Sequence, residues 1–108
     1  MGTRAITEIK PLNMWVITQF DGDNIGENVE KAIRNGNAGN ILEVIEEHHT
    51  IRAQGKTEKA VRKMYGVTSE KDYHLFMEWK WIIQKNWKIR EDKTFRKKSR
   101  KVLKNLYG

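Results

Sequence analysis

Residues 73–83 alternate between apolar and polar side chains without a break, and this alternation constrains the fold more than any other feature. The apolar positions are Tyr73, Leu75, Met77, Trp79, Trp81 and Ile83. Successive side chains of a strand point to opposite faces, so this period predicts a strand with one buried face. A turn at residues 84–86 and renewed alternation through residues 87–90 predict a hairpin. One long helix is the alternative, because a helical stripe also connects Phe76, Trp79, Ile83 and Trp87.

A second hairpin is predicted near the N-terminus. Residues 3–9 alternate weakly, and residues 13–20 are rich in β-branched and aromatic side chains, as strands usually are. Pro11, the only proline of the chain, falls between them, where a missing backbone N–H does no harm. We therefore expect strands at about 3–9 and 13–20, joined by a turn.

The middle of the chain has helical periodicity. Residues 25–35 place apolar side chains on one helical face, with Asp23 or Asn24 available as the cap and Asn35-Gly36 as the end. A second helix is predicted from Ile41 to about Gly55, because apolar residues continue the stripe over that range. Residues 56–65 form a third, shorter helix that Gly66 closes, and residues 93–107 form a basic fourth one.

These elements predict an α+β fold in which two β-hairpins form a small, largely antiparallel sheet of four strands, with helices between the hairpins. Residues 1–92 are expected to form a single α+β domain, and residues 93–108 a basic amphipathic C-terminal helix packed on it or extending from it. The expected core comprises Trp15, Ile17, Leu42, Ile45, Val61, Leu75, Met77, Trp81 and Ile83.

The charge of the chain is divided unevenly between its halves. Residues 1–54 hold 5 basic and 8 acidic side chains, a net charge of −3, whereas residues 55–108 hold 16 basic and 6 acidic ones, a net charge of +10. Such an excess in one half indicates an anionic partner, and a cationic helix gains by docking on phosphates because neutralised phosphates release counterions. The predicted nucleic-acid-binding residues are Lys88, Arg90, Lys93, Arg96, Lys97, Lys98, Arg100, Lys101 and Lys104.

Other partners remain open for this basic segment. It could enter an acidic groove of another protein, or it could stay solvated and have no partner. Membrane adsorption is disfavoured because the apolar stripe of the helix is narrow and poor in Trp. No apolar run approaches the ~20 residues of a membrane span, and neither a signal peptide nor a cysteine is present, so a cytoplasmic protein is expected.

Aromatic side chains near the basic segment could add stacking surfaces for unpaired bases. Trp87, Tyr107 and the exposed side of the Trp79–Trp81 strand are the candidates. A helix-turn-helix is a further possibility at residues 58–79, because Gly66-Val67-Thr68 resembles the turn of such motifs. Arg62 stands where those motifs usually have a small buried residue, which weakens this hypothesis.

Two polar clusters are candidates for chemistry. Neighbours in a helix point about 100° apart, so His48 and His49 cannot share a face and no metal ligand is assigned. Asp21 or Asp23 could serve a metal-dependent nuclease, but Asp-Gly turn chemistry and helix capping account for both residues. We therefore assign no catalytic residue, no metal ligand and no cofactor.

The opening Met1-Gly2-Thr3-Arg4, followed after one hairpin by Phe20-Asp21-Gly22, resembles a group of small uncharacterised bacterial and phage proteins. The resemblance covers the first quarter of the chain and implies a hairpin start and a mobile-element origin, but no reaction. Asp23-Asn24 stand where that group has Tyr-Pro, which leaves the role of that segment here in doubt.

The function expected from the sequence is therefore non-enzymatic binding of nucleic acid by an accessory protein of phage or mobile-element origin. The basic C-terminal segment would contact phosphates, with little sequence specificity. The alternative is a phage-type inhibitor or adaptor that binds a host protein of a nucleic-acid machine. The composition does not distinguish DNA from RNA.

Overall fold

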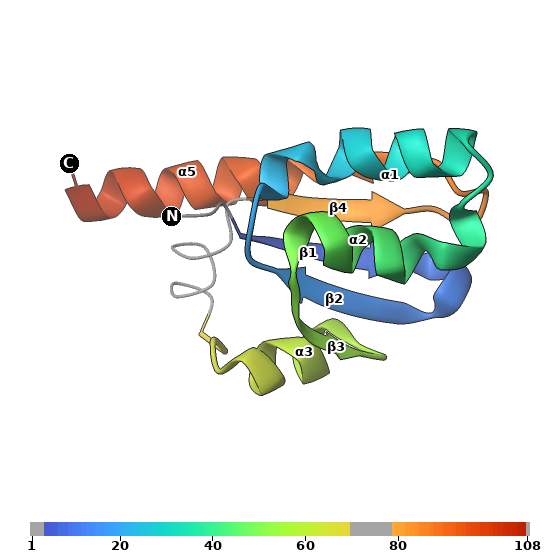
Figure 1. Cartoon of the computed structure of the whole chain (residues 1–108). Coiled ribbons are helices and arrows are strands. Elements are labelled where there is room, and N and C mark those ends of the chain that lie inside the picture. The colour runs from blue at the N-terminus through green and yellow to red at the C-terminus, as the bar shows by residue number, and fades with distance from the viewer. Residues whose placement is uncertain (1–3, 70–78, 108) are drawn as a thin grey trace.

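A five-stranded mixed sheet with the order β3-β2-β1-β4-β5 forms the centre of the fold (Figure 1). The computed structural model describes residues 4–69 and 79–107. The strands are β1 (Ala5–Ile9), β2 (Met14–Thr18), β3 (Ile51–Gly55), β4 (Trp79–Ile83) and β5 (Ile89–Glu91). β1 pairs antiparallel with β2 and parallel with β4, and the two other pairings, β2 with β3 and β4 with β5, are antiparallel. The α+β class predicted from the sequence is confirmed.

The N-terminal hairpin forms where the sequence predicts it. A short 3-10 turn at Lys10–Leu12, with Pro11 in its first turn, connects β1 to β2. Asn13 closes this turn in the left-handed conformation, with φ of 50°, which Asn adopts more readily than most residues. Residues 79–91 form the predicted C-terminal hairpin, which consists of β4 and β5. Residues 73–78 of the predicted strand lie outside the described residues.

One face of the sheet packs against α1 (Ile25–Arg34) and α2 (Ile41–His49) (Figure 1). The buried residues between them are Ala5, Ile9, Val16, Ile25, Val29, Ala32, Ile41, Ile45 and Ile83. At Gly26, α1 lies directly against the ring of Trp81. The Nε1–H of Trp81 donates a hydrogen bond to the Gly22 carbonyl at 2.7 Å. This face carries most of the apolar burial.

The other face packs against α3 (Glu58–Tyr65) and the first two turns of α5 (Lys93–Tyr107). Its buried cluster consists of Ile6, Ile17, Ala53, Val61 and Phe95, with Trp15 and Tyr65 half-buried beside it. α5 then continues past the sheet, so that its C-terminal half projects from the body of the protein (Figure 1). The molecule is accordingly elongated, with extents of 46 × 26 × 24 Å.

The predicted second helix is too long, and the sheet has one strand more than predicted. α2 ends at His49, and Thr50 takes a positive φ of 53° that interrupts the helix. Residues 51–55 then pair with β2 as the edge strand β3, with an irregular register opposite Ile17 and Thr18. Pairing with β2 therefore overrides the local helical stripe in this segment.

The predicted core is largely confirmed where the structure describes it. Ile17, Ile45, Val61 and Ile83 are fully buried, and Trp15, Leu42 and Trp81 are half-buried at the margins of the core. Leu75 and Met77 lie outside the described residues. Asn24 stands at the start of α1 as predicted, although neither it nor Asp23 makes a side-chain capping bond there. Thr57 caps α3 by accepting a hydrogen bond from the Ala60 N–H.

Candidate nucleic-acid interface

α5 begins at a well-defined cap. The Asp92 side chain accepts a hydrogen bond from the Phe95 N–H at 3.1 Å, and the Asp92 N–H donates to the Lys80 carbonyl at 2.7 Å. An Asp at a helix N-terminus accepts a hydrogen bond from an otherwise unpaired backbone N–H, and its negative charge interacts favourably with the positive end of the helix dipole. The cap therefore fixes the start of α5 to strand β4.

Two side chains hold the first half of α5 on the sheet. Phe95 is 6% exposed and Ser99 is 4% exposed, and their spacing of four residues places them on the same side of the helix. Phe95 joins the apolar cluster on the α3 face of the sheet. The side of α5 that includes these two residues is thus the anchoring side.

Arg96 also anchors the helix. Its guanidinium carbon lies 3.7 Å from the centroid of the Trp79 ring, and its Nε lies 3.9 Å from a carboxylate oxygen of Glu91. The Arg96 side chain is only 24% exposed. The charge pattern of the sequence predicts Arg96 to bind phosphate, whereas its contacts here are with the sheet.

A charged network connects α3 to β4 beneath Phe95. The Glu58 carboxylate accepts hydrogen bonds from Arg62 at 2.6 Å and from Lys80 at 3.1 Å. The Lys80 ammonium lies 5.7 Å from the centre of the Phe95 ring and 5.4 Å from that of Trp15. Burial alone would raise the pKa of Glu58, but hydrogen bonds and charges from Arg62 and Lys80 outweigh it and hold that pKa below its ordinary value. The network joins two elements that support α5.

The remaining cations of α5 point to solvent. The exposed ones are Lys93, Lys97, Lys98, Arg100, Lys101 and Lys104. Lys93, Lys97, Arg100 and Lys104 follow a spacing of 4, 3 and 4 residues, which places them in one row on the side of the helix away from Phe95. α5 contains no acidic residue. Its outer side is therefore a continuous cationic surface.

The two predicted residues outside α5 lie on the β4–β5 hairpin. Both are exposed. Arg90 of β5 pairs with Ile82 of β4 and so points to the face of the sheet on which Phe95 packs. Lys88 precedes β5 and lines a pocket with Arg34 of α1. Lys85, exposed in the turn of this hairpin, is absent from the residues predicted from the sequence. The sequence could have indicated Lys85 as a further phosphate-binding residue, because it lies only three residues before Lys88.

Of the aromatic stacking surfaces predicted from the sequence, those of the tryptophans are largely occupied, and the side chain of Tyr107 lies outside the described part of the structure. Trp79 stacks on Trp81 with ring centroids 5.8 Å apart and an angle of 7° between the rings, and it also contacts Arg96. Both rings pack against the core beneath α1 and α2. Trp87 is half-buried against the same core. These contacts leave the tryptophans poorly placed to stack on bases.

The other candidates from the sequence are the histidine pair, the aspartate pair and the possible helix-turn-helix. His49 is buried between α1, α2 and the end of β2, whereas His48 is exposed. Asp21 and Asp23 are exposed around the turn that leads into α1. In the described residues no group of three or more His, Asp or Glu side chains is arranged to hold a metal ion. α3, the first helix of the possible helix-turn-helix, packs on β2 and β3, and its Arg62 side chain is buried. The second helix of that motif would fall mostly outside the described residues.

None of the helices in the described part of the chain has the length and apolar character needed to cross a bilayer. The cap and the contacts with the sheet fix α5 at its N-terminal end and on one side, and its exposed cations lie on the opposite side.

No protein-family model, no curated protein and no solved structure matches this chain.

Proposed function

We propose that this protein binds nucleic acid without catalysing a reaction, and that the outer side of α5 contacts the phosphates. The observation that carries the proposal is the row Lys93, Lys97, Arg100 and Lys104 on a helix whose opposite side is anchored by Phe95 and Ser99. We further propose that Lys88 and Arg90 extend this contact along the β4–β5 hairpin.

The charge density of α5 supports this proposal. Fifteen residues at a rise of about 1.5 Å span about 22 Å, and seven of them are Lys or Arg. A DNA strand carries one phosphate charge per ~3.4 Å of its helix axis, so cations and phosphates have similar linear densities. The acidic residues before α5 are engaged, because Asp92 caps the helix and Glu91 lies beside Arg96.

The different roles of the two sides of α5 also support it. Capping and anchoring hold the helix in place before any partner arrives, so binding does not have to order the backbone of the segment. Ordering a disordered segment on binding costs a substantial part of the interaction free energy. A preformed cationic helix avoids that cost.

We expect duplex DNA to be preferred over single strands. The major groove of B-DNA is about 12 Å wide and admits an α-helix, whereas the major groove of A-form RNA is too narrow for side chains to read. Single-strand binding usually depends on exposed aromatic rings, and Trp79 and Trp81 pack on each other and on the core. Contacts of Lys and Arg with phosphates carry little sequence information, so specificity should be low.

The test is fluorescence anisotropy of labelled duplex DNA, single-stranded DNA and duplex RNA at about 50 and 200 mM salt. The triple variant Lys97→Gln, Arg100→Gln, Lys104→Gln should bind more weakly, and its plot of log K against log salt should be less steep by about 0.9 for each phosphate that the variant no longer neutralises. No binding of any nucleic acid by the wild type at low salt would refute the proposal and leave the protein-directed alternative.

A matched control separates local contacts from net charge. Lys56→Gln, Lys59→Gln, Lys63→Gln removes the same three charges from exposed positions at and before α3. This variant should keep most of the affinity of the wild type. Equal losses of affinity in the two triple variants would mean that overall charge, rather than α5, determines binding.

A further inference from the structure

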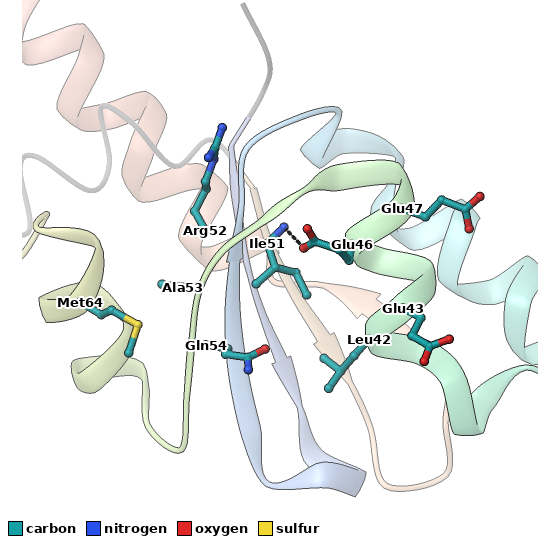
Figure 2. A pocket seen from close by; sticks show the side chains of 9 residues that line it. All are labelled: Leu42, Glu43, Glu46, Glu47, Ile51, Arg52, Ala53, Gln54 and Met64. Atoms are coloured by element: carbon teal, nitrogen blue, oxygen red, sulfur yellow. Dashed lines mark hydrogen bonds between the residues drawn. The ribbon is translucent and has the colours of Figure 1, made fainter.

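A groove runs along the free edge of β3, between α2 and α3 (Figure 2). Its volume is about 630 Å³, and four successive residues of β3, Ile51 to Gln54, line it. Because both faces of the strand contribute, the groove follows the strand edge rather than one face of the sheet. Leu42 of α2 and Met64 of α3 border it on either side (Figure 2).

The floor of the groove is apolar and one margin is acidic. Leu42, Ile51 and Ala53 form the floor, and Met64 beside them is 63% exposed, more than Leu12 or Phe20, the other exposed large apolar side chains of the described residues. The acidic margin consists of Glu43, Glu46 and Glu47 of α2. Glu46 turns inward and accepts a hydrogen bond from the Ile51 N–H at 2.6 Å. Glu43 and Glu47 project outward (Figure 2) and have no ion-pair partner among the described residues.

Arg52 of β3 also lines the groove, but its side chain donates a hydrogen bond to Gln19. The two outward carboxylates, Glu43 and Glu47, beside an apolar floor favour an occupant that combines basic and apolar side chains. The chain itself carries such a segment, because α5 has seven Lys or Arg residues, no acidic residue and the apolar Val102. The α5 of the same molecule cannot enter the groove, since Asp92 and Phe95 fix it to β4 at the other side of the sheet (Figure 1). Its C-terminal half projects from the body and is open to a neighbouring molecule.

We propose that the groove between α2 and β3 accepts the C-terminal half of α5 from a second copy of this chain. Glu43 and Glu47 would pair with Lys101 and Lys104 of the second copy, and Met64 would contact its Val102. Each copy carries one groove and one helix, so two copies can exchange helices reciprocally in a two-fold dimer, and a one-way contact continues into a ring or an open filament. One helix in one groove falls below a standard interface of about 1,600 Å², so the association should be weak.

This inference does not depend on nucleic-acid binding, but the two compete if both hold. The cations that would enter the groove belong to the surface proposed to contact phosphates. Duplex DNA should therefore dissociate the assembly.

Sedimentation velocity over a range from micromolar to millimolar protein tests the proposal at low salt. The wild type should show a sedimentation coefficient that rises with concentration. Glu43→Lys with Glu47→Lys, and separately Lys101→Glu with Lys104→Glu, should each remain monomeric, because like charges then meet at the contact. An equimolar mixture of these two double variants should associate again, since each groove faces a complementary helix.

Controls keep the result specific. Glu27→Lys with Glu30→Lys changes the charge equally on exposed positions of α1 and should associate as the wild type does. Met64→Ser should weaken association without any change in charge. Urea unfolding curves that match the wild type would show that the variants are folded.

Three outcomes would overturn the proposal: a monomeric wild type throughout, groove variants that associate normally, or a mixture that fails to associate. If a peptide of residues 93–108 binds the groove while the whole chain stays monomeric, the occupant is a basic segment of another protein. At concentrations where the protein is monomeric, Glu43→Lys with Glu47→Lys should bind DNA at least as well as the wild type. That readout separates failure of this inference from failure of the proposed function.

Discussion

The guanidinium of Arg96 lies over the ring of Trp79 at 3.7 Å from its centroid and connects the first turn of α5 to strand β4. This contact distinguishes the role of Arg96 from that of the other cations of the helix. Arg96 holds α5 against the sheet, and the cations that remain exposed, such as Lys97, are available to a ligand.

Replacing Arg96 by Gln should therefore lower stability. Loss of a partly desolvated cation–π contact costs about 1–2 kcal/mol, and the nearby Glu91 loses its partner as well. Lys97→Gln, one residue further on, should leave the free energy of unfolding unchanged and weaken DNA binding instead. Urea unfolding followed by tryptophan fluorescence measures the first effect, and anisotropy measures the second. Equal stability of both variants would contradict the anchoring role of Arg96.

Gly26 allows α1 to lie directly on Trp81. A Cβ at position 26 would come within 2.5 Å of the Trp81 ring, which is held by its hydrogen bond to the Gly22 carbonyl. Gly26→Ala should destabilise the protein by about 1–3 kcal/mol, the usual cost of overpacking. Gly39→Ala is the matched control, because a Cβ at position 39 would meet nothing within 4 Å. A thermal melt in which both variants match the wild type would show that α1 can shift without cost.

The Glu58 carboxylate supports the packing of α3 on β4. Glu58→Gln should destabilise the protein by about 1–3 kcal/mol, because it removes a carboxylate that pairs with both the buried Arg62 and Lys80. Glu30→Gln removes one member of an exposed pair with Arg34 and should change stability by less than about 0.5 kcal/mol. Urea unfolding compares the two variants, and a Glu58→Gln protein as stable as Glu30→Gln would show that the network does not contribute.

His49 should make stability depend on pH. The Asn28 amide lies 3.0 Å from its Nε2 and the Phe20 carbonyl 2.8 Å from its Nδ1, an arrangement that suits a neutral ring that donates from Nδ1 and accepts at Nε2. Burial lowers the pKa of His49, and the charge of His48 adds to this, although the Phe20 carbonyl, Asp21 and Asp23 oppose it.

Because the pKa of His49 is lower in the folded than in the unfolded chain, protonation favours unfolding. The stabilisation is fully present above the unfolded pKa of about 6.5 and is lost as pH falls through the lower folded pKa. In urea unfolding at pH 7.5 and at pH 5 (about 1 unit above and about 1.5 units below that pKa), the loss of stability on acidification should be smaller in His49→Gln than in the wild type. His48→Gln, at an exposed position, should retain most of the wild-type loss, because burial is the largest cause of the lowered pKa of His49. The same loss in all three proteins would exclude His49 as the cause.

The sequence predicts the elements with strong periodicity and misses those that depend on distant pairing. The two hairpins, α1, α3 and α5 follow from local patterns and turn residues. β3 does not, because Ile51 and Ala53 continue the helical stripe of α2 and only pairing with β2 makes them a strand. The parallel pairing of β1 with β4 likewise has no local signal.

At the candidate interface, the sequence predicts that the cations of α5 are exposed. It does not predict which of them anchors the helix to the sheet and which are available to a ligand. A helix with one apolar stripe must display its other side, so Lys97, Arg100 and Lys104 follow from spacing alone. The anchoring role of Arg96 requires contact with Trp79, which lies in another element. The sequence also does not show that the tryptophan rings are covered, because they are covered by packing between elements that are distant in the chain.

The parallel contact between β1 and β4 also sets the order in which the protein can assemble during synthesis. Ala5 pairs with Trp79 and Ile9 with Ile83, so β1 has no partner on that side until the last third of the chain has left the ribosome. Until then β1 exposes an unpaired strand edge that other chains could join. The nascent protein therefore depends on late C-terminal residues to close its sheet, and truncation before β4 should yield an aggregation-prone chain rather than a smaller domain.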